Sequence, residues 1–227
     1  MYFDAAPNTG TPYRRCVGAA TAATVQGPYT PQASPIVCGE NKYGWIDASG
    51  FVDTTANPQQ RYILYKLDGT NPGDPSAPTP NPRVPSQILI QQVDFDNGVT
   101  PLGSASTILQ SVGDSTDYGT VEAPSLIVNP NPSPRTGGYV LFYSSGFYMN
   151  NTYTVSYATA QNVTGPYTKQ GVLLETGSYG LSAPGGADVV RDGSKMVFHA
   201  NAGREWNGTR YMWTGEVMIV GTNVTVT

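Results

Sequence analysis

Charged residues are scarce in this chain of 227 residues. Only 12% of the residues are Asp, Glu, Lys or Arg, against about 25% in an average soluble domain. The chain has 12 Lys and Arg against 16 Asp and Glu, so its net charge is −4. Proteins that bind nucleic acids carry clustered positive charge for the phosphates. The composition therefore argues against nucleic acid as a partner.

Long apolar runs, histidines and cysteine clusters are lacking as well. No run approaches the roughly 18 apolar residues of a membrane helix, so we expect no membrane contact. His199 is the only histidine, and Cys16 and Cys38 are the only cysteines. Zinc sites need close clusters of these residue types, so none is expected. The segment 1–5 has neither the basic start nor the apolar stretch of a signal peptide.

Glycine, proline and tyrosine are plentiful, with 26, 19 and 15 residues. The hydrophobic share of 39% is enough for one sizeable core and argues against disorder. No segment shows sustained helical periodicity. The apolar runs are short, β-branched or aromatic, and bounded by turn residues, which is typical of strands. We therefore predict an all-β fold.

Four Asn-X-Thr sequons favour a secreted, extracellular glycoprotein whose signal peptide is not in this chain. They begin at Asn150, Asn162, Asn207 and Asn223. In an oxidising compartment we expect a disulfide between Cys16 and Cys38, which would stabilise the fold by about 3 kcal/mol through loop closure. Two free buried thiols are the alternative.

Two internal repeats are present. In the first, a short strand and a polar turn precede a stronger strand, and the stronger strands are expected at 61–66, 138–143 and 194–199. In the second, residues 17–30 match residues 155–168 without a gap, and both copies end in Gly-Pro-Tyr-Thr. Repeats of antiparallel strands at this length are typical of a β-propeller.

The repeats predict the limits of the propeller blades. Residues 45–115, 120–180 and 183–227 are expected to form three blades, and residues 1–30 the outer part of another. The whole chain, 1–227, would then be a single partial propeller domain. The proline-rich segment 70–85 is predicted to be an insertion within a blade.

Three acidic residues interrupt strands that we expect to line the central channel: Asp47, Glu122 and Asp188. Apolar neighbours would desolvate these carboxylates and raise their pKa values. Paired carboxylates across one channel suit glycoside hydrolysis, in which one protonates the leaving oxygen and another activates water or attacks the sugar. The alternative is that each acid caps a turn. Glutamate is a poor turn former, so Glu122 fits that alternative least.

The ordered motifs around these acids resemble glycoside hydrolase family 43. They are Ile-Asp at 46–47, Glu-Ala-Pro at 122–124 and Gly-Gly-Ala-Asp at 185–188, each followed by its stronger strand. The family consists of five-bladed β-propeller enzymes that hydrolyse arabinans, xylans and related plant polysaccharides with inversion. The resemblance implies a plant cell-wall oligosaccharide or polysaccharide as the partner and no required cofactor.

The resemblance also implies roles for single residues. Glu122 matches the general acid, and Asp47 matches the carboxylate that orients this acid and adjusts its pKa. His199 matches a channel residue that supports a structural calcium ion through water, or a water alone; a hydrogen-bonded residue at a strand end is the alternative. Trp45 and Tyr143 could bind substrate by stacking on sugar rings, or pack in the core.

One element of the family pattern has no match. The aspartate that acts as general base belongs to the first blade, which would precede Met1, and Asp4 aligns with a middle strand instead. The resemblance therefore predicts a five-bladed propeller that here lacks the first blade and part of the second. Loss of the base would slow an inverting enzyme by orders of magnitude.

Three hypotheses follow from the sequence. The chain is part of a secreted family 43 glycosidase of the arabinofuranosidase, xylosidase or arabinanase type. Alternatively, it is an inactive, carbohydrate-binding relative of these enzymes. A propeller of another class, such as a lectin or an interaction platform, is the third hypothesis, and the acids of the innermost strands argue against it.

Overall fold

A computed structural model describes residues 1–6, 15–38, 44–69, 84–114, 116–132, 138–203 and 205–227. These residues form fifteen strands and one 3-10 turn, η1 (Ser178–Gly180). Within these ranges, no helix is long and apolar enough to cross a membrane.

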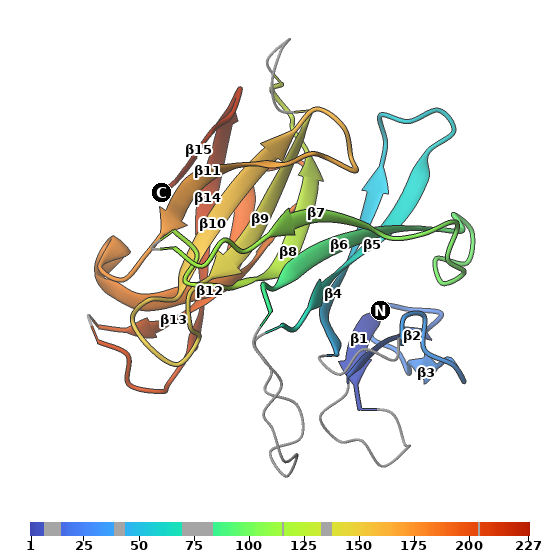
Figure 1. The fold of residues 1–227 in the computed structure, drawn as a ribbon, viewed down its shortest axis with the longest axis horizontal. Helices are drawn as coiled ribbons and strands as arrows, with labels where there is room; N and C mark the ends of the chain where they lie inside the picture. The colour runs from blue at the N-terminus through green and yellow to red at the C-terminus, as the bar shows by residue number, and fades with distance from the viewer. Residues whose placement is uncertain (7–14, 39–43, 70–83, 115, 133–137, 204) are drawn as a thin grey trace.

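The strands form four antiparallel sheets, each a meander in sequence order (Figure 1). The first sheet holds β1 (Tyr2–Ala5), β2 (Cys16–Thr21) and β3 (Thr30–Pro31). The second holds β4 (Trp45–Asp53), β5 (Gln60–Leu67), β6 (Gln87–Val93) and β7 (Ser106–Gln110). The third holds β8 (Val121–Val128), β9 (Tyr139–Ser145), β10 (Thr154–Ala160) and β11 (Thr168–Leu174). The fourth holds β12 (Leu181–Val189), β13 (Lys195–Ala202), β14 (Tyr211–Val220) and β15 (Asn223–Val226).

The sheets meet along their first strands. β4 packs against β8, and β8 packs against β12, while β1 packs against β4. Meanders whose first strands face one another are the blades of a β-propeller. The predicted all-β propeller fold is therefore confirmed. The described residues contain three blades of four strands and one sheet of three strands.

Each hydrophobic core lies between two neighbouring blades. Alternate residues of β9 point in opposite directions, so Leu141 joins the core shared with the second sheet and Phe142 joins the core shared with the fourth. Every residue of β9 and β10 is consequently buried. This packing explains why β9 begins with a continuous apolar run, residues 139–143, in the sequence.

The repeated Gly-Pro-Tyr-Thr turn folds in the same way in both copies. The hydroxyl of Tyr29 donates a hydrogen bond to the carbonyl oxygen of Val25 over 3.0 Å. The hydroxyl of Tyr167 donates to the carbonyl oxygen of Val163 over 3.1 Å. The prediction that the two segments are structural equivalents is confirmed, because they form β2–β3 and β10–β11.

Two further predictions concern covalent and loop structure. Cys16 and Cys38 form a disulfide, as expected, which ties the start of β2 to the segment after β3. The proline-rich segment connects β5 and β6, adjacent strands of one sheet. It is therefore inserted within a blade, although residues 70–83 lie outside the described residues.

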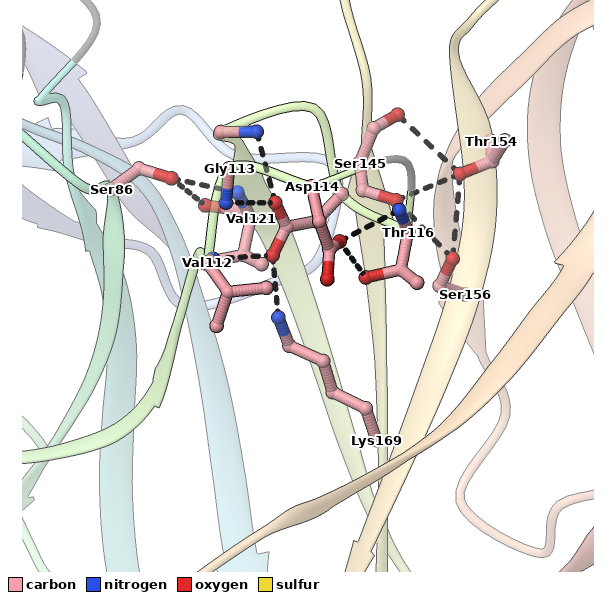
Figure 2. A network of polar contacts seen from close by, with 12 residues as sticks. Ser86, Val112, Gly113, Asp114, Thr116, Val121, Ser145, Thr154, Ser156 and Lys169 are labelled. Carbon is pink, nitrogen blue, oxygen red and sulfur yellow. Dashed lines mark hydrogen bonds and ion pairs between the residues drawn. The ribbon is translucent and has the colours of Figure 1, made fainter.

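A network of polar contacts organises the connection between the second and third sheets, and Figure 2 shows Val112, Gly113 and Lys169 pointing into it. Asp117 has no exposed surface and accepts hydrogen bonds from the backbone N–H groups of Val112, Gly113 and Gly119 at 2.7–2.9 Å. Lys169 of β11 donates to the same carboxylate over 2.5 Å. Burial alone would raise the pKa of Asp117, but the bonds from Lys169 and the backbone hold it below its usual value.

Removing the lysine tests the contribution of this ion pair. Lys169→Met should lower the free energy of unfolding by about 2 kcal/mol, because Asp117 loses a charged hydrogen bond while it stays buried. Urea denaturation at pH 7 measures the change. Lys195→Met, at an exposed lysine, is the matched control and should stay within about 0.5 kcal/mol. Equal effects of the two substitutions would contradict the prediction.

Candidate active site

The first strands of the three four-stranded blades share one irregularity. Their pairing shifts register after Ile46 in β4, after Glu122 in β8 and after Ser182 in β12. At each shift, a residue other than glycine has a positive φ angle, with values of 57°, 48° and 49° at Asp47, Ala123 and Ala183. Such conformations are uncommon and concentrate at functional sites. The equivalent bulges therefore mark one end of the channel as the candidate site.

The bulges place Asp47 beside Glu122. The carboxylate of Asp47 accepts a hydrogen bond of 3.0 Å from the backbone N–H of Ala123, the residue that follows Glu122. Burial and the charge of Glu122 together raise the pKa of Asp47 to about 6, although Lys66 and the backbone bond from Ala123 oppose this shift. The structure thus brings together the two acids that the sequence singled out.

Both oxygens of Glu122 have protein partners. Lys66 of β5 donates to Oε2 over 2.7 Å, and the hydroxyl of Tyr153 donates to Oε1 over 2.6 Å. These partners come from two different blades. Together they fix the orientation of the carboxylate and stabilise its charge.

Lys66 is the most unusual residue of the site. Its side chain is 2% exposed and lies between the carboxylates of Glu122 and, 3.1 Å away, Asp68. Burial lowers the pKa of Lys66, but the charges of Glu122 and Asp68 outweigh burial and hold it above its usual value. Lys66 is therefore a buried cation paired with two carboxylates.

His199 lies on the other side of Tyr153. The two rings stack with centroids 5.8 Å apart and an interplanar angle of 13°. Burial and the charge of Arg210 lower the pKa of His199 to about 4, although Glu122 opposes this shift. The imidazole is therefore neutral at pH 7, and its buried Nδ1 has no hydrogen-bond partner among the described residues.

The calcium ion implied for His199 can be tested against its surroundings. Calcium prefers six to eight oxygen ligands. Within the described ranges, no group of three or more His, Cys, Asp and Glu residues could hold a metal ion, and the charge of Arg210 acts on the imidazole. These residues do not fit a directly bound calcium ion. The unpartnered Nδ1 fits a water molecule, and calcium stays a prediction.

Asp188 occupies a different part of the channel from Glu122. It accepts a hydrogen bond of 2.7 Å from the hydroxyl of Ser125. It lines a cavity of about 410 Å³ together with Asp47 and residues of β8 and β12. Asp188, on β12, therefore places a carboxylate in the channel next to Ser125. Ser125 lies three residues after Glu122 along β8.

The two aromatic residues expected to stack on sugars are engaged in packing. Trp45 meets Tyr65 edge-on, with ring centroids 5.3 Å apart. Tyr143 is 3% exposed and belongs to the core between the second and third sheets. Tyr143 therefore offers no free ring face to a sugar, and the structure supports the packing alternative for both residues.

Sequence reasoning missed Lys66 and Tyr153. A signal for Lys66 existed, because it continues the alternation of the inward-facing residues Tyr62 and Leu64 along β5. Tyr153 follows a loop, and its contact with Glu122 depends on how the third blade folds back on itself. No local pattern indicates such a contact.

Comparisons with known proteins show a family match and several similar structures. The family described as Glycosyl hydrolases family 43 matches residues 1–222, and no curated protein sequence matches. A thermostable family-43 glycoside hydrolase has a similar structure, with a TM-score of 0.77 and 23% identity over 100% of this chain and 70% of that one. An endo-1,4-beta-xylanase from Bacteroides thetaiotaomicron has a TM-score of 0.69 and 24% identity, over 100% of this chain and 70% of that one. An endo-arabinase from the same organism has a TM-score of 0.67 and 17% identity, over 96% of this chain and 71% of that one.

The raised pKa of Asp47 predicts a pH-dependent stability. The folded state holds this proton more tightly than the unfolded chain, so stability should fall as the pH rises from about 4 to about 6. Asp47→Asn removes the ionisation and keeps an acceptor for the N–H of Ala123. Relative to the original protein, this variant should gain up to about 3 kcal/mol between pH 4 and pH 7. Urea denaturation at both pH values measures the gain.

Two further variants sharpen this test. Lys66→Met removes a charge that lowers the pKa of Asp47, so the decline in stability should extend to higher pH. Asp96→Asn changes an exposed aspartate and serves as the control. A gain for Asp47→Asn no larger than that of the control would refute the predicted pH dependence.

Proposed function

Because the chain belongs to glycosyl hydrolases family 43, we propose that it hydrolyses O-glycosidic bonds in xylan, arabinan or arabinoxylan of plant cell walls. The placement of the two acids carries the proposal: the carboxylate of Asp47 accepts a hydrogen bond from the backbone N–H of Ala123, the residue after Glu122. Support for the substrate class comes from similar structures, which include an endo-1,4-beta-xylanase and an endo-arabinase.

Glu122 is the general acid in this proposal, and the reaction inverts the anomeric carbon. Glu122 gives its proton to the leaving oxygen while the bond from that oxygen to the anomeric carbon breaks. The carboxylate that remains is stabilised by Lys66 and by the hydroxyl of Tyr153. Asp47 orients the acid and, through its charge, influences how readily the proton is released.

The proposal assigns no general base to this chain. Inversion needs a carboxylate that activates water on the opposite face of the sugar. Asp4 lies on β1 with Arg15 at 3.8 Å, and Asp188 accepts a hydrogen bond from Ser125. General acid–base groups contribute about 10²–10⁴-fold to rate. Turnover by the 227-residue chain should therefore be slow.

An external nucleophile tests the acid separately from the base. Azide is already an anion, so it can attack the anomeric carbon without a base while Glu122 protonates the leaving oxygen. With phenyl xyloside or phenyl arabinofuranoside, azide should accelerate phenol release and give a glycosyl azide of inverted configuration. Glu122→Gln should slow this reaction by about 10²–10⁴-fold.

Glu175→Gln, at an exposed glutamate, is the matched control and should react like the original chain. An azide reaction that is insensitive to Glu122→Gln would contradict the role of Glu122 as the acid. Fast hydrolysis without azide would show that a residue of this chain serves as the base.

A second candidate function is carbohydrate binding without hydrolysis. It is favoured by one observation, that both oxygens of Glu122 are already occupied by Lys66 and Tyr153. In that case xylohexaose should bind equally well to the original chain and to Glu122→Gln. No product should form from either protein, with or without azide.

We also propose that the protein is secreted and glycosylated. The Cys16–Cys38 disulfide supports an oxidising compartment, and the asparagines of all four sequons are exposed. In protein secreted from a eukaryotic host, glycopeptide mass spectrometry should find glycans on at least one of these asparagines. Recovery of only unmodified peptides from all four sequons would contradict glycosylation.

A further inference from the structure

Exposed aromatic residues lie close to the candidate site on the loop between β9 and β10. Phe147 and Tyr148 are 51% and 47% exposed, and their ring centroids are 5.3 Å apart. We refer to these two side chains as the aromatic ridge. The loop leaves β9 at the end that carries Glu122, because Val121 pairs with Ser145. The ridge therefore lies at the same end of the blade as the acid.

The loop is held in place by its own polar groups. The hydroxyl of Thr152 accepts a hydrogen bond from the N–H of Phe147 and donates one to the side chain of Asn150. Asn151 bonds with the carboxylate of Glu205 and the backbone of Trp206. The ridge is therefore a preorganised surface, and little conformational entropy would be lost when a ligand binds.

Several side chains lie between the ridge and Glu122. Tyr153, at the end of the same loop, bonds with Glu122 and stacks on His199. The charge of Arg210 acts on His199. The guanidinium of Arg210 donates a hydrogen bond of 2.7 Å to the carbonyl oxygen of Tyr148 and lies 5.2 Å from the centre of its ring. The ridge thus lies beside Arg210, and the same loop ends at Tyr153, which contacts Glu122.

We propose that the aromatic ridge binds a pyranose ring of a xylan-type chain next to the sugar held at Glu122. This inference rests on the proposed function and specifies its substrate class. A xylopyranose ring carries its hydroxyl groups equatorially and its hydrogens axially, so both of its faces are flat and apolar. Such a face can cover an exposed aromatic ring, which removes apolar surface from water. The puckered ring of an arabinofuranose offers a smaller apolar face.

Binding of hexasaccharides tests the proposal without requiring turnover. The protein is produced in a bacterium, so that it carries no N-glycan, and is titrated calorimetrically with xylohexaose and with α-1,5-arabinohexaose. The double variant Phe147→Ala/Tyr148→Ala should bind xylohexaose about tenfold more weakly, the effect of 1.4 kcal/mol. Its affinity for arabinohexaose should change less than threefold. An unchanged melting temperature confirms that the variant is folded.

The chain offers a matched control for the loss of an aromatic ring. Arg61 lies 5.3 Å from the ring centre of Phe95, and Phe95 is exposed. Arg61 is at the end of β5 that is remote from Lys66, so Phe95 lies away from Glu122. Phe95→Ala should bind xylohexaose like the original protein. If the double variant does so too, or if the original protein does not bind xylohexaose, the proposal is overturned.

Other occupants of the ridge give different results. A dimer that becomes a monomer in the double variant would assign the ridge to a second copy of the chain and overturn the proposal. Equal losses for xylohexaose and arabinohexaose would overturn the choice of a pyranose. A glycan on Asn150, in protein from a eukaryotic host, is a further candidate occupant. If this glycosylated protein and its double variant bind xylohexaose with the same affinity, the glycan occupies the ridge and the proposal fails. The effect of Glu122→Gln on the azide reaction is measured separately, so failure of the proposed function can be told apart from all these outcomes.

Discussion

Each four-stranded sheet of this protein buries its apolar side chains chiefly against neighbouring sheets. A single strand such as β9 therefore contributes Leu141 to one core and Phe142 to the next. This constraint fixes the angle at which blades meet and brings their first strands together. The polar chemistry follows from that meeting, since the candidate site lies where β4 and β8 face each other.

The charged groups between β4 and β8 are stabilised by partners from more than one blade. Glu122 receives hydrogen bonds from Lys66 of the second sheet and from Tyr153, which precedes β10 of its own sheet. Asp47 of the second sheet accepts a hydrogen bond from the backbone N–H of Ala123 in the third sheet. Since isolated buried charges are costly, each group requires the others. The bulges of β4 and β8 make these contacts possible by turning the backbone toward the neighbouring blade.

The fold could be predicted from the sequence because its signals are local and repeated. Residues 17–30 and 155–168 share one pattern and one turn, and the continuous apolar run at the start of β9 corresponds to a strand covered on both faces. The pair of Asp47 and Glu122 was accessible through family motifs. Lys66 and Tyr153 were not identified, because their importance arises from the packing of one strand against another. Tyr143 shows the converse: the sequence left stacking on a sugar and packing in the core both open, and the ring fills a core.

The register between the second and third sheets is also maintained by a buried hydroxyl. Ser86 donates a hydrogen bond to the carbonyl oxygen of Val121 and accepts one of 2.7 Å from its N–H, directly before Glu122. Displacement of one sheet along the other would therefore alter the separation of Lys66 and Glu122. The geometry around Glu122 is thus mechanically coupled to sheet alignment. Substitutions far from Glu122 can alter its hydrogen bonds by moving one blade against its neighbour.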